Sequence, residues 1–494
     1  MSGRRKNAAA IAVVAIVVVA GLAAFFLVGP GRYAVYSSTT NSCMLPGGAN
    51  PSRETLQKVS FGAVTEYSLP LSSRWSNAVV AAPDGSVWFG EQSLPGVGHL
   101  YVNGTLVEYP WPSAEGTQNT CGYKTGIWGI EVWDGMVWAT DSDENALVGV
   151  NQTSGKTTVV NVTGAAPQPY TLAPAPDGSL WFTSLSPRAV LGRLSPDLSV
   201  TAYAVNLTSG EVPVQVDFVN STYAYFVALN PVEPYGHLYS FDPEAEGGAI
   251  NAVQLGGEYR VLEPSSLSYS GGLVWVTEHG TSDVVALDTA SGNWTVYPTS
   301  TVNYTTTTLP YFVDASGQGV WFNEHYANRI AVINSSAETL TEYSEADPPV
   351  ENGSLIQNDL TIAHGHGGLW FTSVTGNYVG FVNESARPPF TLSLQGADSA
   401  SVAPGVTANL RLEAMGSWSR PLLVQVSDSE DYGARPYKIS IAPSAQQIQP
   451  GTGPAQLRVA VTPQTGLAPG RYTVAVTVSD GLVSQTSYFF LNVS

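Results

Sequence analysis

The stretch Ala82-Pro-Asp-Gly-Ser-Val-Trp-Phe89 returns almost unchanged as Ala175-Pro-Asp-Gly-Ser-Leu-Trp-Phe182, and shorter copies of it continue along the chain. Each copy is a glycine-containing turn followed by an apolar segment that carries an aromatic residue. We call these aromatic residues the markers. They recur every 43 to 50 residues, a period that is typical of repeat architectures. The markers are Trp88, Trp138, Trp181, Tyr225, Trp275, Trp321 and Trp370.

Each repeat reads as four strands. A short apolar strand leads into the turn, and the marker strand follows. An alternating strand comes next, as in Arg329–Ile333, and a last strand closes the unit, as in Thr339–Tyr343. Four strands in a repeat of this length are the pattern of a β-propeller blade, and no helical periodicity competes with it. A linear solenoid of the same repeats is the alternative.

Ring closure decides between the two architectures. The seventh unit runs from Asp359 to about Phe381 and lacks its fourth strand, whereas an unpaired strand, Val64–Leu69, precedes the first unit. This N-terminal strand resembles the closing strands Val107–Pro110 and Thr341–Ser344. We predict that it completes the last blade, which would remove two exposed sheet edges. A linear array would gain nothing from this exchange, so the sequence predicts an all-β, seven-bladed propeller over residues 59–387.

The N-terminus predicts a membrane anchor. Arg4, Arg5 and Lys6 precede an uninterrupted apolar run of 21 residues, Ala8–Val28, which is long enough to cross a bilayer as a helix. The basic cluster should remain cytoplasmic, which places the rest of the chain outside the cell. We therefore expect a single-pass membrane protein with a cytoplasmic stub and anchor over residues 1–30 and an extracellular stalk over 31–58. A cleaved signal peptide is the alternative.

The C-terminal region differs from the repeats. Residues 388–494 contain about seven alternating apolar stretches with turn residues between them, as in Leu457–Val461 and Tyr472–Val478. This pattern favours an immunoglobulin-like β-sandwich, and the absence of a cysteine pair excludes the antibody subtype. We expect such a domain to mediate contacts or to hold the propeller away from a neighbour.

Composition limits the partners. Charged residues make up only 12% of the chain and the net charge is −19, so nucleic acid is excluded as a partner. Low charge, an acidic balance and many glycosylation motifs indicate an archaeal surface protein. Eleven Asn-X-Ser/Thr motifs predict a glycosylated exterior. They lie at Asn103, Asn151, Asn161, Asn206, Asn220, Asn293, Asn303, Asn334, Asn352, Asn383 and Asn492.

The two cysteines of the chain, Cys43 and Cys121, also fit export. In an extracellular protein a single pair forms a disulfide more often than a metal site or a nucleophile. The bridge would tie the stalk to the propeller. Two unpaired thiols are the alternative.

Candidate site residues follow the marker strands. The residue three positions after each marker should lie at one mouth of the central channel, where second strands end and first strands begin. Carboxylates gathered there could bind a ligand, or Mg²⁺ or Ca²⁺ through their oxygen atoms, and the next position holds His279 and His325 as candidate bases. These residues could instead simply cap strand ends. The seven positions are Glu91, Asp141, Ser184, Ala228, Glu278, Glu324 and Ser373.

The other histidines are weaker candidates. His364 and His366 lie in a turn that should face the opposite mouth, and we expect them to be surface residues. His99 and His237 each precede a third strand within a His-Leu-Tyr segment, where packing or hydrogen bonding is the expected role.

The repeat, with its Asp-Gly-x-Leu/Val-Trp-Phe-Thr/Asn-Glu pattern and closing Glu-Tyr, resembles the streptogramin B (virginiamycin B) lyase family of seven-bladed propellers over about residues 60–385. The resemblance implies magnesium-dependent elimination that opens a cyclic depsipeptide ester. It also implies that Glu263 and Glu278 are the carboxylates that hold the metal. Ser265 stands where the family has its catalytic histidine, and Tyr311 follows Pro310 in the sixth blade, so the partner histidine is absent too.

Three functions remain open from the sequence. The first is a membrane-anchored extracellular propeller that binds a ligand, a glycan or a cell-surface protein. The second is a lyase or hydrolase with a metal at Glu263 and Glu278 and with His279 or His325 as the base. The third is a structural component of a glycoprotein surface layer.

Overall fold

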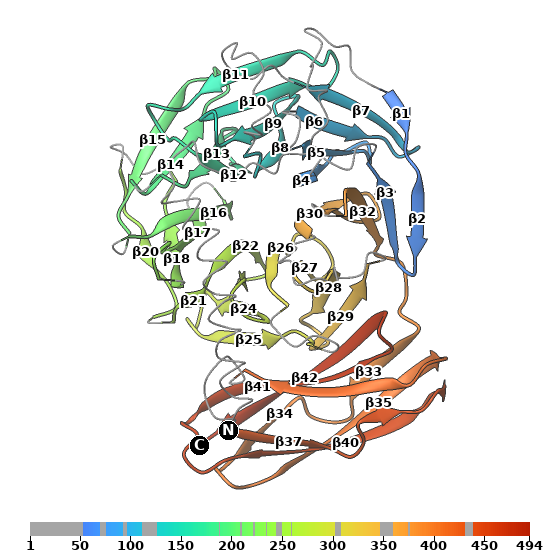
Figure 1. Cartoon of the computed structure of the whole chain (residues 1–494). Coiled ribbons are helices and arrows are strands. Elements are labelled where there is room, and N and C mark those ends of the chain that lie inside the picture. The colour runs from blue at the N-terminus through green and yellow to red at the C-terminus, as the bar shows by residue number, and fades with distance from the viewer. Residues whose placement is uncertain are drawn as a thin grey trace, which may run out of the picture.

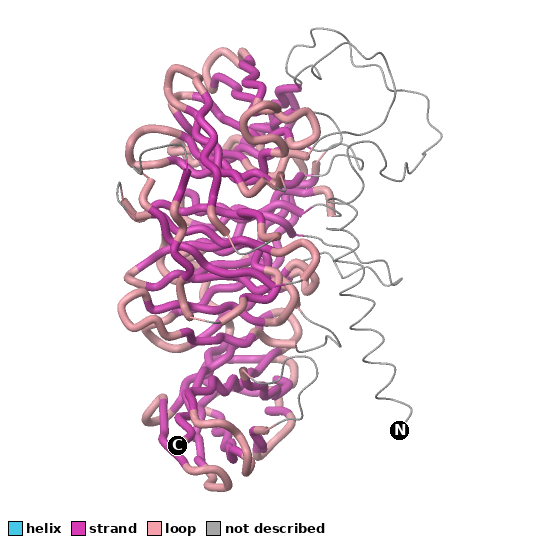
Figure 2. Tube along the Cα trace, turned by 90° about the vertical axis from the view of Figure 1, so that its left-hand side faces the viewer, coloured by secondary structure: helices cyan, strands magenta, loops and turns pink. Residues whose placement is uncertain are grey.

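A computed structural model describes most of the chain after residue 52. The predicted anchor, both cysteines, Asn303 and Asn352 lie outside the described residues. Within the described ranges the secondary structure consists of strands, and no helix there has the length and apolar character needed to cross a bilayer (Figure 2). The described ranges are 53–69, 76–91, 96–110, 126–186, 188–207, 210–220, 223–233, 235–243, 249–257, 259–301, 308–345, 359–373, 376–429 and 438–494.

Seven sheets of the described residues are arranged in a ring (Figure 1). In every blade the first strand of the repeat is innermost and the other strands of that repeat follow outward, while strands from elsewhere in the chain are added at the outer edges of blades 1, 3, 6 and 7. The strands are β4 (Ser76–Ala81), β5 (Val87–Glu91), β6 (Gly96–Leu100) and β7 (Thr105–Pro110) in blade 1; β8 (Ile130–Trp133), β9 (Met136–Asp141), β10 (Ala146–Asn151) and β11 (Thr157–Asn161) in blade 2; β12 (Pro169–Pro174), β13 (Leu180–Ser184), β14 (Val190–Leu194) and β15 (Val200–Val205) in blade 3; β16 (Val212–Phe218), β17 (Ala224–Leu229), β18 (Tyr235–Phe241), β20 (Val253–Gln254) and β21 (Val261–Leu262) in blade 4; β22 (Pro264–Ser270), β23 (Leu273–Glu278), β24 (Asp283–Asp288) and β25 (Trp294–Pro298) in blade 5; β26 (Pro310–Asp314), β27 (Val320–Glu324), β28 (Arg329–Asn334) and β29 (Thr339–Ser344) in blade 6; and β30 (Asp359–Gly365), β31 (Gly368–Ser373) and β32 (Tyr378–Asn383) in blade 7.

The predicted ring closure is confirmed. Strand β3 (Val64–Ser68) pairs antiparallel with β32 of blade 7, with Glu66 opposite Gly380, and β2 (Lys58–Phe61) adds a further strand outside it. The propeller begins earlier in the chain than expected, because β1 (Arg53–Thr55) pairs with β7 of blade 1. Part of the segment predicted to be stalk is therefore built into the ring. Blade 3 also gains an outer strand, β19 (Ala249–Ile250), which pairs with β15.

Apolar clusters hold neighbouring blades together. The cluster around Trp88 combines Val97 of blade 1 with Ile130 and Val137 of blade 2. The cluster around Phe89 includes Trp370 and so joins blade 1 to blade 7. Since all seven markers are at most 8% exposed, burial between blades explains why the sequence repeats them.

The phenylalanine after the marker has a fixed partner. Phe182 lies opposite Gly192 on the next strand, and a Cβ atom at this glycine would come within 2.1 Å of the ring. The same arrangement places Phe371 over Gly380. The glycine of the third strand is therefore required by the ring that covers it.

A threonine two residues after the marker links each of several blades to the next. Its hydroxyl donates a hydrogen bond to a backbone carbonyl oxygen on the inner strand of the following blade. The bonds are Thr140 to Tyr170 (3.1 Å), Thr183 to Val214 (2.9 Å), Thr277 to Tyr311 (2.7 Å) and Thr372 to Asn77 (3.0 Å). The last of these joins blade 7 to blade 1, so the same contact continues across the point of closure.

Residues 390–493 form two further sheets around one apolar core, in which Leu412, Val461, Val476 and Leu491 are fully buried. The first sheet is joined to the propeller, because β42 pairs antiparallel with β29 from Thr339–Ser487 to Tyr343–Val483. Blade 6 and this sheet thus form one nine-stranded sheet (Figure 1), which the sequence did not predict. The strands are β34 (Ser399–Val402), β36 (Leu422–Asp428), β38 (Gln447–Ile448), β41 (Gly470–Ser479) and β42 (Val483–Val493) in the first sheet, and β33 (Phe390–Leu394), β35 (Ala408–Trp418), β37 (Ile439–Pro443), β39 (Gly451–Thr452) and β40 (Ala455–Pro463) in the second.

Candidate functional site

The carboxylates selected from the sequence lie at the ends of second strands. Glu91, Asp141, Glu278 and Glu324 are each the last residue of such a strand, as are Ser184 and Ser373, whereas Ala228 is the last but one. In blade 5, Glu278 pairs with Pro264, the first residue of the inner strand. The same pairing recurs in blade 6, so these residues share one end of the ring.

Glu278 is buried and neutral. It is 5% exposed, and its Oε1 atom accepts hydrogen bonds from the Leu262 amide (3.1 Å) and the Tyr259 hydroxyl (3.2 Å). Burial, together with the nearby charge of Asp283, raises the pKa of Glu278 to about 8. At neutral pH this carboxyl group therefore keeps its proton.

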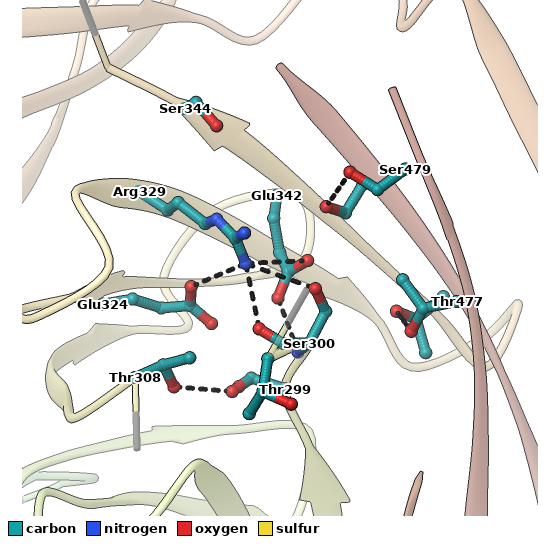
Figure 3. A network of polar contacts seen from close by, with 12 residues as sticks. Thr299, Ser300, Thr308, Glu324, Arg329, Glu342, Ser344, Thr477 and Ser479 are labelled. Atoms are coloured by element: carbon teal, nitrogen blue, oxygen red, sulfur yellow. Dashed lines mark hydrogen bonds and ion pairs between the residues drawn. The ribbon is translucent and has the colours of Figure 1, made fainter. Parts of the chain in front are cut away.

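Glu324 belongs to a buried polar cluster within blade 6 (Figure 3). Arg329 Nη1 lies 3.6 Å from Oε2 of Glu324 and 3.6 Å from Oε2 of Glu342, and it also donates to the Ser300 carbonyl (2.9 Å). Burial and the neighbouring Glu342 raise the pKa of Glu324 well above its usual value. This cluster satisfies buried charges and ties the segment after β25 to blade 6, which is a structural role.

The other two predicted ligand residues are equally buried. Glu91 and Asp141 are each 3% exposed. Asp141 Oδ1 accepts a hydrogen bond from the Glu144 amide (3.1 Å), which stabilises the turn after the strand.

The residues do not fit the predicted metal site. Oε1 of Glu278 already accepts two hydrogen bonds, and Glu263 Oε2 faces His279 Nδ1 at 3.6 Å. Among the residues that the structure describes, no three His, Cys, Asp or Glu side chains gather in a way that could hold an ion. Mg²⁺ and Ca²⁺ require several oxygen ligands, so we assign no metal-dependent step to Glu263 and Glu278.

The two candidate bases lie in contact. His279 Nε2 is 3.3 Å from His325 Nδ1, and His279 Nδ1 is 3.6 Å from Glu263 Oε2. Glu263, His279 and His325 thus form a carboxylate–imidazole–imidazole chain between blades 5 and 6. A chain of this kind can orient a proton on the second imidazole. Both rings are buried, with exposures of 5% and 2%.

Two tyrosines meet across the channel beside these histidines. The hydroxyl groups of Tyr170 in blade 3 and Tyr311 in blade 6 are 2.8 Å apart. The ring of Tyr311 contacts His279 and His325 edge to face, with centroid distances of 5.1 and 4.9 Å. Trp128 of blade 2 contacts Tyr170 at 5.6 Å. We call Trp128, Tyr170, Glu263, His279, Tyr311 and His325 the mouth cluster.

The aromatic members of the cluster share one structural position. The carbonyl of Gly126 accepts a hydrogen bond from the residue after Asp141, as the carbonyl of Glu263 does from the residue after Glu278. In each blade, the residue two positions after the one that supplies this carbonyl occupies the shared position. These residues are Trp128 in blade 2, Tyr170 in blade 3, Ser265 in blade 5 and Tyr311 in blade 6. Sequence reasoning missed Trp128 and Tyr170, although the pairs Pro169-Tyr170 and Pro310-Tyr311 could have indicated them.

The backbone conformation of the residue before each inner-strand proline is a feature of the fold and not of one site. Glu263 has φ of 48°, in the left-handed region, but Gln168 (56°) and Leu309 (54°) share it before the prolines of blades 3 and 6. Each of these carbonyls accepts a hydrogen bond from the residue that follows a second strand. The strained backbone therefore sets the entry of the inner strand and does not single out Glu263. Ser265 is buried, and its hydroxyl donates to the Glu263 carbonyl (3.3 Å).

The remaining histidines have identified partners. His99 stacks on Trp88 at 3.9 Å and bonds Ser86 (2.7 Å), and burial lowers its pKa to about 4. His237 Nδ1 lies 2.6 Å from Glu211 Oε1, which confirms hydrogen bonding as its role. His364, at the end of β30, contacts Asp314 (2.9 Å) and Glu384 (2.7 Å), so it is a partly buried ion-pair partner and not a free surface residue.

Ring and mouth together define the class of the protein: a seven-bladed β-propeller with an aromatic and imidazole cluster across its channel. Among solved structures, a catalytically inactive variant of virginiamycin B lyase from Staphylococcus aureus, determined with quinupristin, is similar with a TM-score of 0.50. It shares 16% sequence identity, and the match covers 65% of this chain and 98% of the lyase. The expected resemblance in fold is thereby confirmed.

AztD from Citrobacter koseri, in its apo form, is similar with a TM-score of 0.37 and 10% identity, over 61% of this chain and 97% of that one. No protein-family model matches the chain, and no curated protein matches it either.

Proposed function

We propose that the protein is an extracellular ligand-binding propeller, that residues 8–28 hold it at the cell membrane, and that the mouth cluster is its binding site. The observation that carries the proposal is the meeting of Tyr170, Tyr311, His279 and His325 from blades 3, 5 and 6 at one end of the channel. Mouths of this kind combine ring faces with a few polar groups, which is the usual composition of a small-molecule site.

The surface of the propeller supports an extracellular location. Of the nine described glycosylation motifs, seven have an exposed asparagine, and Asn151 and Asn492 are partly buried. We extend the proposal to the C-terminal sheets, which we infer to be an immunoglobulin-like contact domain. The disulfide between Cys43 and Cys121 would suit the same oxidising compartment.

Crystals soaked with small ring compounds test the binding site. The set contains acidic, basic and neutral compounds, each at one concentration. Electron density in contact with Tyr311 or His279 supports the proposal. Density confined to other surfaces, or a mouth that no compound enters, contradicts it.

A lyase or hydrolase activity is the second candidate, and one contact favours it. The chain from Glu263 through His279 to His325 could supply a base, although Ser265 occupies the position of the family's histidine. Quinupristin, which the similar lyase was determined with, is the substrate to test.

The full-length protein is incubated with quinupristin, and the mixture is analysed by chromatography with mass detection. A ring-opened product that His279→Ala or His325→Ala no longer forms would establish catalysis. Tyr223→Ala, on an exposed turn of blade 4, is the control. Intact quinupristin after prolonged incubation removes this substrate from consideration.

A further inference from the structure

The exposure of the channel aromatics sets them apart from the other rings of the propeller. Trp128, Tyr170 and Tyr311 are partly buried, whereas markers such as Trp138 and Trp181 are completely buried. The markers already fill the spaces between blades, so packing does not require three more rings on the inner strands. Part of each of these side chains is left accessible.

The hydroxyl bridge fixes these rings in space. Tyr170 extends from blade 3 to the apolar cluster between blades 4 and 5, where it packs near Val214 and Leu267. There its hydroxyl meets that of Tyr311, at 2.8 Å. The two side chains together span from blade 3 to blade 6, and we call this pair of tyrosines the floor of the mouth. Trp128, in ring contact with Tyr170, extends this floor toward blade 2.

The electrostatics of the floor disfavour a cationic ligand. Glu278 retains its proton, because burial disfavours its ionised form, and the buried Glu324 already lies beside Arg329. Glu263, the carboxylate of the mouth cluster, faces His279, with 3.6 Å between Oε2 and Nδ1. A cation would find no free carboxylate among these three residues.

The polar groups of the floor suit a ligand with hydroxyl groups. Tyrosine hydroxyls both donate and accept hydrogen bonds, as the hydroxyl groups of a sugar do. Ring faces such as that of Trp128 pack well against the C–H face of a pyranose, which is apolar. A flat aromatic ligand would use the ring faces alone and would make no hydrogen bond to the tyrosine hydroxyls, so it would gain less binding free energy at this site.

We infer that the mouth cluster binds a neutral carbohydrate, with Trp128 as a stacking face and Tyr311 as a hydrogen-bond partner. This inference rests on the proposed function, since it names the ligand class of the same site.

Calorimetric titration of the full-length protein tests it. The probes are four neutral oligosaccharides: maltopentaose, cellopentaose, mannopentaose and chitopentaose. We expect at least one of them to bind. Trp128→Ala should weaken that binding about tenfold or more, and Trp128→Phe should weaken it less, because a smaller ring face remains. Tyr223→Ala removes an exposed ring elsewhere and should change nothing.

Because Trp128→Ala could disturb folding, thermal unfolding of each variant is recorded as well. Tyr311→Phe removes only a hydroxyl group and provides a second, milder variant. Binding that both Trp128→Ala and Tyr311→Phe leave unchanged overturns the inference, since the sugar would then lie elsewhere.

The soaking experiment separates this inference from the proposed function. If a charged or purely aromatic compound occupies the mouth and none of the four oligosaccharides binds, the carbohydrate inference fails and the binding function stands. If nothing enters the mouth and no oligosaccharide binds, both fail.

Discussion

Glu278 ends a strand at the mouth, where its Oε1 atom accepts hydrogen bonds from Leu262 and Tyr259. A sequence pattern can place this residue correctly but cannot give its charge, because the charge depends on how many groups surround it in three dimensions. The pattern Trp-x-Thr-Glu is the same at a solvated strand end and at a buried one. The prediction of metal ligation was made without that information.

Glu278→Gln should stabilise the protein at neutral pH. The folded-state pKa of Glu278 is about 8, above the value of a free glutamate. As pH rises from about 4.5 to about 8, the unfolded chain loses this proton and the folded chain keeps it, so the carboxyl group reduces stability increasingly over that window. Glutamine keeps the acceptor oxygen without ionising.

Urea unfolding of wild type and Glu278→Gln at about pH 5 and about pH 7.5 measures this effect. The advantage of the variant should be larger at the higher pH. An advantage that is equal at both values would mean that Glu278 is ionised in the folded protein.

The bridge between Tyr170 and Tyr311 should contribute measurably to stability. Tyr170→Phe and Tyr311→Phe each remove one hydroxyl of a partly buried pair, and each should cost about 1 kcal/mol in free energy of unfolding. The double variant should cost less than the sum of the two, because it leaves no hydroxyl without its partner. Additive losses in a double-mutant cycle would show that the two hydroxyls do not interact.

At the level of elements, the sequence contains enough information for blade order and for closure. The markers repeat because each must fill the space between two blades, and the unpaired strand at Val64 had a single vacant edge to occupy. The position that four blades share near the start of the inner strand was not predicted. The residues there differ in type and have only their backbone position in common; they are Trp128, Tyr170, Ser265 and Tyr311. The pairing of β29 with β42 was missed for a related reason. Two edge strands pair through their backbones, so the order of apolar and polar side chains does not show which edges meet.

Proline scanning of the closing segment tests its importance. Thr65→Pro lies in β3, between β2 and β32, and should interrupt the ladder that closes the ring. Losing buried backbone hydrogen bonds there should cost roughly 1–3 kcal/mol each. Val59→Pro lies in the outermost strand β2, at an exposed position, and serves as the control.

Thermal unfolding of both variants gives the answer. The midpoint of Thr65→Pro should fall well below that of Val59→Pro. Equal midpoints would indicate that β3 adds little to the closure of the ring.

On the scale of the whole molecule, the propeller and the C-terminal sheets are joined by a common β-sheet as well as by the connecting chain. The ladder between β29 and β42 is supported by the Tyr488 hydroxyl, which donates to the Pro298 carbonyl (3.0 Å), and by Gln485, which donates to Thr341 (2.9 Å). Tyr488 and Phe490 also enter the apolar cluster between blades 5 and 6. The two parts therefore contribute to one another's core.

We expect the two parts to unfold in a single transition. Scanning calorimetry of the full-length protein should show one peak, and Tyr488→Ala should lower its temperature, since a buried aromatic residue lost from a core costs about 3–5 kcal/mol. Two separate peaks in the wild-type protein would mean that the shared sheet does not couple the two parts.

The predicted anchor is tested in membranes of the producing cells. Residues 8–28 should keep the full-length chain in the membrane pellet after alkaline washing, and external protease should degrade the propeller in intact cells. Recovery of a shortened chain in the medium would favour signal-peptide cleavage instead.

The shared sheet also determines how the molecule would carry mechanical load. A pull applied between the N-terminal strands and the C-terminal sheets would enter through β1 to β3 and leave through β32 and the β29–β42 ladder. Tension would therefore run through blades 1, 7 and 6, reach blade 5 through the contact of Tyr488 with Pro298, and bypass blades 2 to 4. Trp128 and Tyr170 belong to blades 2 and 3, outside this load path, so this side of the mouth should keep its geometry while the two ends are pulled apart.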